Sequence, residues 1–95
     1  MHLISRKRLL EAAAIHSMLL APLDTWYRIA KKAKWTSLDE VQTVLPTADA
    51  VGKFTVFNIK GNAFRLIAEI NYKTGRVYIR HVMTHAEYER GAWKQ

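Results

Sequence analysis

The sequence has no cysteine, two prolines, four glycines and no long uninterrupted apolar run. Without cysteine there are no disulfides, no thiolate zinc ligands and no cysteine nucleophile, and this suits the reducing cytoplasm in which we expect the protein. The apolar stretch after the basic residues 1–8 is interrupted by Glu11, His16 and Asp24, so we expect neither a secretion signal nor a membrane span. Scattered histidines and the lack of carboxylates paired at ligand spacing predict no metal site. No phosphate-binding glycine loop is present, and we expect no cofactor.

Charge is strongly biased towards the positive side. Fifteen Lys and Arg residues stand against eight Asp and Glu, which gives a formal net charge of +7 over 95 residues. This excess favours a polyanionic partner, nucleic acid first, although many basic domains bind nothing in particular. The length suffices for one modest hydrophobic core and no linker or repeat divides it, so we expect residues 1–95 to form a single domain.

The first half of the chain carries helical patterns. Residues 2–5 suit a short strand, after which Ser5 is positioned to cap a helix that continues to Met18. A break near Pro22 begins a second, amphipathic helix. A capping-box pattern at Ser37 then predicts a third short helix.

The second predicted helix carries a basic stripe. Arg28, Lys31, Lys32 and Trp35 follow the spacing i, i+3, i+4, i+7, which places them on one side of a helix. Repulsion among the three cations is relieved if phosphate or an acidic partner covers them, with Trp35 beside it. Ordinary solvated surface explains the stripe equally well, so RNA contact is one of two open interpretations.

The second half of the chain is rich in branched and aromatic residues and predicts three strands, at 53–60, 63–72 and 77–83. A two-residue turn pairs Lys60 with Ala63, and a four-residue connection pairs Tyr72 with Val77, which gives an antiparallel meander. The predicted fold class is therefore α+β, with N-terminal helices packed on one face of a small antiparallel sheet.

Alternation along the strands sorts the side chains onto two faces. The face predicted to pack under the helices carries Phe57, Ile59, Phe64, Leu66, Ala68, Ile70, Val77, Ile79 and Met83. The other face carries Asn58, Arg65, Glu69, Asn71, Tyr78 and Arg80, with Val56, Ile67 and Val82 between them. In this register Glu69 lies opposite Arg80, and His85 and Tyr88 follow the third strand near the edge of the polar face. His16, on the first helix surface, and His81, on the apolar face, are not catalytic candidates.

The polar face holds the residue types that metal-independent RNA cleavage requires. Such an enzyme aligns the ribose 2′-hydroxyl with phosphorus, moves protons and stabilises the added negative charge. Arg65 and Arg80 suit the scissile phosphate because guanidinium groups donate paired hydrogen bonds; Glu69 then orients Arg80, or forms a purely structural ion pair with it. His85 suits acid–base catalysis and Tyr88 suits base stacking or proton donation. Asn58 and Tyr78, with the basic stripe, complete the expected RNA-binding set.

Four segments resemble HigB-type toxins of the RelE/ParE-like superfamily: MHLISRKRL, WYRIAKKAKWTSLDEV, VFNIKGNAFRLIAEINY and VYIRHVMTHAEYER. The resemblance spans nearly the whole chain, and its most specific blocks are GN followed by RL and the THAEY ending. It implies a RelE-like fold and an endoribonuclease, an mRNA interferase, that cuts messenger RNA in the ribosomal decoding site. It also implies a HigA-like helix-turn-helix antitoxin that neutralises the toxin, and operator DNA bound only through the antitoxin complex.

The proposed site residues fall within these blocks. Arg65 lies in the GN-to-RL block, Arg80 in YIR, and His85 and Tyr88 in THAEY, whereas Lys31, Lys32 and Trp35 lie in KKAKW. His81 stands where family members usually carry an apolar aromatic residue. Two alternatives stay open: a ParE-like gyrase poison on the same fold, and a non-catalytic RNA-binding module.

Overall fold

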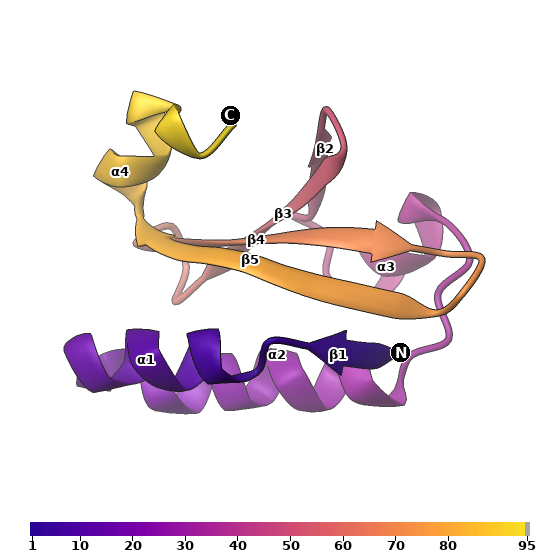
Figure 1. The fold of residues 1–95 in the computed structure, drawn as a ribbon, viewed down its shortest axis with the longest axis horizontal. Coiled ribbons are helices and arrows are strands. Elements are labelled where there is room, and N and C mark those ends of the chain that lie inside the picture. The colour runs from indigo at the N-terminus through magenta and orange to yellow at the C-terminus, as the bar shows by residue number, and fades with distance from the viewer. Residues whose placement is uncertain (95) are drawn as a thin grey trace.

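The computed structural model describes residues 1–94 as a five-stranded sheet with helices on both sides (Figure 1). The sheet order is β1-β5-β4-β3-β2, with the strands at His2–Ile4 (β1), Asp49–Val51 (β2), Phe54–Ile59 (β3), Phe64–Asn71 (β4) and Arg76–Thr84 (β5). The helices are α1 (Lys7–Ile15), α2 (Leu20–Lys32), α3 (Leu38–Val44) and α4 (His85–Arg90), with short 3-10 turns η1 (Ser17–Leu19) and η2 (Ala92–Lys94). In Figure 1, α1 and α2 run along one face of the sheet and α4 lies on the other side. The predicted α+β class with N-terminal helices on one face is confirmed.

The main hydrophobic core lies between the α1–α2 layer and the sheet. Leu9 of α1 and Leu23 of α2 are buried there, and the Trp26 ring meets the Phe57 ring edge to face at a centroid distance of 5.3 Å. Each helix contributes one apolar side, as its amphipathic pattern requires.

None of the helices within residues 1–94 is long and apolar enough to cross a membrane.

The predicted boundaries of α1 are wrong at both ends. The residue at its N-cap position is Arg6 and no side chain caps the helix, because Ser5 adopts a positive φ of 72°. The helix ends at Ile15 and does not reach Met18, since His16 leaves the helical conformation. The His16 ring packs edge-on against Phe64, so it is not simply a surface histidine.

The predicted basic stripe is wrong at Trp35. The α2 helix ends at Lys32 and Ala33 is extended, with ψ at 155°, so the chain turns away before the fourth member of the stripe. Trp35 is only 5% exposed and belongs to the main core. A side chain this buried has no face on which to stack a base.

Sheet register agrees with prediction in one hairpin and differs in the next. Pairing of β3 with β4 has Ile59 opposite Phe64, which continues the predicted Lys60–Ala63 register. Pairing of β4 with β5 has Glu69 opposite Tyr78, two residues from the prediction. The loop closes earlier than predicted because the Asn71 side chain accepts hydrogen bonds from two loop N–H groups and Gly75 takes a positive φ of 71°.

A bulge in β5 reverses which side chains face the helices. The register shifts between Ile67 and Ala68, so Arg80 has no partner in the ladder and His81 pairs with Ile67. Val82 consequently packs on the main core and Met83 on the other face, the reverse of the predicted assignment. His81 pairs with Ile67, whose side chain lies on the face away from the helices, so the predicted placement of His81 on the helix-facing side is also wrong.

Two short edge strands complete the sheet. The predicted strand at the N-terminus is present as β1 and pairs with β5 in parallel, so the sheet is mixed. The other edge strand, β2, pairs antiparallel with β3 and was not predicted. The third predicted helix is present as α3, where the Ser37 hydroxyl accepts a hydrogen bond from the Glu40 N–H at 3.3 Å.

A second, smaller hydrophobic cluster covers the face of the sheet opposite the helices. It contains Phe54, Val56, Ile67 and Trp93, with Met83 and Tyr88 packed against it. This cluster explains why β4 is buried on both faces from Phe64 to Ala68. It also attaches α4 and η2 to the sheet.

Candidate functional site

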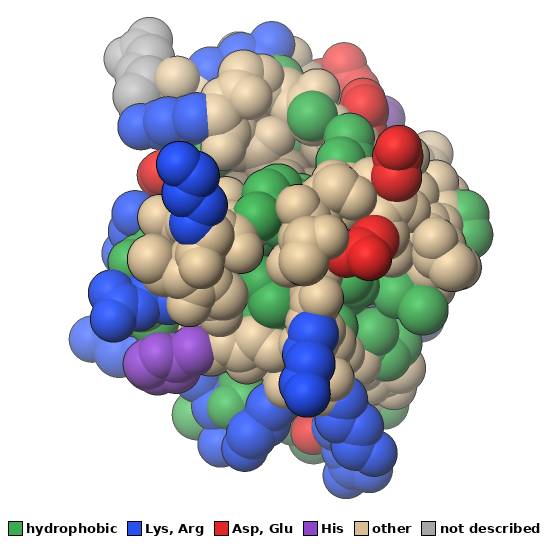
Figure 2. Space-filling model, turned by 90° about the vertical axis from the view of Figure 1, so that its right-hand side faces the viewer, with side chains coloured by type: hydrophobic (Ala, Val, Ile, Leu, Met, Phe, Trp, Pro, Cys, Tyr) green, Lys and Arg blue, Asp and Glu red, His purple; other side chains and the backbone are tan. Residues whose placement is uncertain are grey.

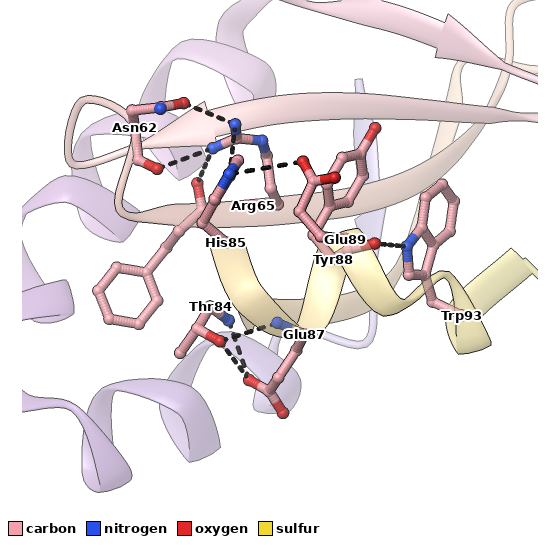
Figure 3. A network of polar contacts seen from close by, with 9 residues as sticks. Asn62, Arg65, Thr84, His85, Glu87, Tyr88, Glu89 and Trp93 are labelled. Carbon is pink, nitrogen blue, oxygen red and sulfur yellow. Dashed lines mark hydrogen bonds and ion pairs between the residues drawn. The ribbon is translucent and has the colours of Figure 1, made fainter.

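Arg65 and His85 form the centre of a polar network at the end of the β3–β4 hairpin (Figure 3). The Arg65 Nη2 atom lies 3.0 Å from His85 Nδ1 and donates a second hydrogen bond to Asn62 Oδ1 at 2.6 Å. Its Nη1 atom donates to the carbonyl oxygens of Asn62 and Phe64. Arg65 is only 8% exposed, so its guanidinium is a buried connector between the hairpin turn and α4.

This network fixes the protonation pattern of the His85 ring. A guanidinium can only donate hydrogen bonds, so Nδ1 must accept and the ring proton must sit on Nε2. The Nε2 atom lies 3.4 Å from Glu89 Oε1, one helical turn further along α4. Arg65 and Glu89 thus hold the imidazole from its two opposite nitrogens.

Tyr88 borders the same cluster. The Arg65 guanidinium lies 5.3 Å from the centroid of the Tyr88 ring, and that ring stacks on Trp93 at a centroid distance of 5.0 Å. The Trp93 indole N–H also donates to the Tyr88 carbonyl oxygen. Three of the four predicted catalytic residues, Arg65, His85 and Tyr88, therefore lie together.

The start of α4 is fixed by a capping box. The Thr84 hydroxyl accepts from the Glu87 N–H, and the Glu87 carboxylate accepts from the Thr84 N–H. The hydrogen bonds that the Thr84 backbone N–H and then the Thr84 hydroxyl donate to this carboxylate lower the pKa of Glu87 below its ordinary range. Because His85 is the first residue of α4, this cap fixes the backbone from which the His85 side chain projects.

Arg80, the fourth predicted catalytic residue, belongs to a separate charged group. Its Nε donates to Glu69 Oε1 at 3.0 Å, and Lys53 Nζ lies 3.8 Å from the same oxygen. The ion pair with Glu69 was predicted, but the two residues meet diagonally across the ladder because the β4–β5 register differs from the prediction by two residues. Glu69 lies four residues along β4 from Arg65, about 13 Å away at the ordinary rise of a strand.

The expected RNA-binding residues on the sheet divide between these two groups. Asn58 is half-buried and pairs directly with Arg65 across β3 and β4. Tyr78 lies under the Arg80 guanidinium, 5.0 Å from it, and lines an open depression of about 640 Å³ together with Lys53, Glu69 and Lys73. The sheet therefore carries an open depression with two lysines on its wall, near the β4–β5 loop and apart from the Arg65–His85 pair.

The structure does not bring the basic stripe to this site. Arg28, Lys31 and Lys32 lie on α2, the helix layer on the opposite face of the sheet. Figure 2 views one end of the molecule, where Lys and Arg side chains gather along the lower and left edges. Arg28 is paired with Asp24 at 3.0 Å.

Sequence reasoning missed three members of the site. Asn62 was read only as a turn residue, although it accepts two hydrogen bonds from Arg65. The acid four residues after His85, Glu89, and the buried Trp93 were not singled out. The i, i+4 spacing of His85 and Glu89 was a usable signal; a lone terminal Trp was not. Within residues 1–94 no three His, Asp or Glu side chains gather as a metal-binding group.

Comparison with known proteins gives one consistent result. Residues 20–91 match the family described as HigB toxin, a RelE-like toxic component of a toxin–antitoxin system. The chain is 31% identical over 93 residues to the mRNA interferase HigB of Escherichia coli O6:H1, which covers 95% of this chain and 90% of that protein. It is 33% identical over 92 residues to the mRNA interferase toxin HigB of Escherichia coli K12 and to mRNA interferase HigB of Shigella flexneri, which covers 94% of this chain and 88% of either protein.

Proposed function

Because the chain belongs to the HigB family of RelE-like toxic components of toxin–antitoxin systems, we propose that it is an mRNA interferase, an endoribonuclease that cuts messenger RNA and so inhibits translation. It acts in the decoding site of the ribosome, needs no metal, and works in the cytoplasm as one domain over residues 1–95. A HigA-like helix-turn-helix antitoxin neutralises it, and operator DNA is bound only through the antitoxin. The observation that carries the proposal is the Arg65–His85 pair at the end of the β3–β4 hairpin in a chain of this family.

His85 is the group in the Arg65 cluster best suited to proton transfer at neutral pH. When a phosphate oxygen takes over the Arg65 Nη2 hydrogen bond, His85 Nδ1 becomes free to accept the proton of the ribose 2′-hydroxyl. The 2′-oxygen then bonds to phosphorus and the bond from phosphorus to the 5′-oxygen breaks. The 5′-oxygen takes a proton from a water molecule, and protonated His85 gives its proton to the hydroxide that remains. Arg65, held by Asn62, stays close enough to stabilise the added negative charge.

The Arg80–Lys53–Glu69 group and the open depression next to it bind the message on one side of the cut. Arg80 and Lys53 share one carboxylate, Glu69, so the group carries a net positive charge that favours a phosphate. Tyr78 offers a half-buried ring for base stacking, whereas the Tyr88 ring already lies between Arg65 and Trp93. The surface has no deep pocket in which to bind an RNA sequence by itself, and this supports dependence on the ribosome.

Purified ribosomes programmed with a defined message test this function. The wild-type chain should leave discrete new RNA ends, ribosome-free message should stay intact, and His85→Ala should slow cutting by about a hundredfold or more. Phenanthroline, which removes transition metals but leaves the Mg²⁺ that ribosomes need, should have no effect. Bound but uncut message would indicate an RNA-binding module, whereas a toxic chain that leaves messages intact would point to a gyrase poison.

A further inference from the structure

A narrow apolar groove separates α1 from α2 on the side of the helix layer that meets solvent. Its walls and floor are formed by Leu9, Leu10 and Ala13 of α1 and by Leu20, Leu23 and Tyr27 of α2. Leu9 and Leu10 lie four and three residues before Ala13, and Leu20, Leu23 and Tyr27 are three and four apart, so they form one stripe per helix, and the two stripes face each other. The groove itself holds only about 60 Å³, room for side-chain tips and not for a small-molecule ligand.

Large apolar side chains are exposed around this groove. Leu10 is 53% exposed and Leu20 is 62% exposed, and Ile15 at the end of α1 and Met18 in η1 are also exposed. Together they are four of the five exposed large hydrophobic residues within 1–94, and Val44 in α3 is the fifth. Apolar side chains gathered in this way on a small domain are typical of an interaction surface.

One end of the groove has a basic rim. A wider depression of about 330 Å³ shares Arg6, Asp24 and Tyr27 with the groove and continues to Lys31 and Lys32. The Arg6 guanidinium and the Lys31 ammonium both lie over the Tyr27 ring, at 4.7 and 5.8 Å from its centroid. Asp24 pairs with Arg28. No acidic side chain of residues 1–94 lies within ion-pair distance of Arg6, Lys31 or Lys32.

We propose that this face binds an acidic amphipathic helix of the antitoxin, with apolar side chains seated between α1 and α2 and carboxylates on the rim. The inference rests on the proposed function, which supplies the partner. Apolar walls favour a protein over RNA, because exposed leucines gain nothing from a phosphate backbone, whereas a helix with anchors at i, i+3 and i+4 buries them. The uncompensated cations of the rim require the same segment to be acidic.

The probe is the protein encoded beside this chain's gene whose co-expression restores growth, purified and titrated against the toxin. Leu10→Asp and Leu20→Asp should each weaken binding about tenfold to a hundredfold, and Arg6→Glu should weaken binding and reduce its salt dependence. Val44→Asp is the matched control, since Val44 is as exposed as Leu10 but lies on α3, and it should leave the dissociation constant unchanged. All four substitutions are at exposed positions, and thermal unfolding checks that each variant folds.

Message cutting on ribosomes separates this inference from the proposed function. Leu10→Asp and Leu20→Asp should cut at the wild-type rate while escaping neutralisation. If both bind the antitoxin as tightly as Val44→Asp does, the docking surface is wrong although the toxin still cuts. If both lose cutting but keep the antitoxin, the face serves the ribosome or RNA and the inference is overturned. If the wild-type chain neither cuts nor has a neutralising partner, the proposed function itself fails.

Discussion

Arg65 joins three parts of the chain through one side chain: the hairpin turn, the start of β4 and the first residue of α4. Four of its contacts are hydrogen bonds, and their directions follow the planar guanidinium. Lysine carries the same charge but has only one nitrogen from which to donate, so it cannot serve Asn62, Phe64 and His85 together. Arg65 is therefore a positioning residue for His85 as well as the nearest cation to it.

We expect Arg65→Ala to slow message cutting about tenfold to a thousandfold, and Arg65→Lys to recover little of that loss. The positioning role has its own measurement, the ¹⁵N NMR signals of the His85 ring. The wild-type protein should show the proton on Nε2, whereas Arg65→Ala should show a mixture of tautomers. An unchanged tautomer in a folded, inactive Arg65→Ala variant would mean that Arg65 acts on the phosphate alone.

His81 makes the stability of the fold depend on pH. Burial, with Arg8 and Arg80 adding to it, lowers the pKa of His81 below its ordinary value of 6.5. The folded state therefore favours the neutral ring, and its contribution to stability is complete above about pH 6.5 and is lost as the pH falls towards the lowered pKa.

We expect His81→Phe to flatten the decline in the free energy of unfolding between about pH 7.5 and pH 5.5, measured by urea denaturation. Phe is the informative replacement because it keeps an aromatic ring and removes the titration. Equal slopes in the variant and the wild type would show that His81 is not responsible for acid sensitivity in this range.

Among the elements, α4 connects local stability most directly with the site, because His85, Tyr88 and Glu89 all lie on it. Its capping box satisfies N–H groups that a six-residue helix otherwise leaves unpaired. The pattern of Thr84 followed by Glu87 was visible in the sequence and was overlooked because the segment is so short.

We expect Thr84→Ala to lower the free energy of unfolding by about 1 kcal/mol and to slow cutting as well, since a frayed α4 misplaces His85. Ser37→Ala is the matched control, because it removes the same kind of cap from α3. It should cost similar stability, measured by urea denaturation, and leave the cutting rate unchanged. Equal cutting rates for the two variants would show that the α4 cap does not contribute to message cutting.

The elements also show where sequence reasoning succeeds. Turn chemistry was sufficient for the β3–β4 register, which places Asn58 beside Arg65. It failed for β5, because the loop closes earlier than predicted on the Asn71 side chain and Gly75, and the bulge at Arg80 then shifts the register again. The diagonal Arg80–Glu69 pair was still predicted, since long side chains reach across a two-residue error.

At the scale of the whole molecule, two hydrophobic clusters hold the sheet between them, and the smaller one depends on Trp93. The Trp93 ring meets Phe54 edge-on and stacks on Tyr88. The sequence predicts that the face carrying Arg65 is polar and basic, with Val56, Ile67 and Val82 between the polar residues. The alternation of side chains along the strands does not show that the segment around Trp93, more than twenty residues further along the chain, returns to cover part of that face.

We expect Trp93→Ala to lower the free energy of unfolding by about 3–5 kcal/mol, a large part of what a domain of this size has. Trp93→Phe should recover most of that stability, because an aromatic ring still fills the cluster. Urea denaturation followed by circular dichroism measures both. A loss below about 1 kcal/mol for Trp93→Ala would show that the second cluster is not part of the cooperative fold.

The central claim, that the His85 face of this fold cuts messages during translation, is tested most directly in growing bacteria. The wild-type chain and His85→Ala are expressed without an antitoxin at matched levels, and message ends are mapped by primer extension before and after growth slows. We predict new ends confined to translated messages for the wild type and none for His85→Ala. Growth arrest with intact messages, or the same cuts made by His85→Ala, would contradict the claim.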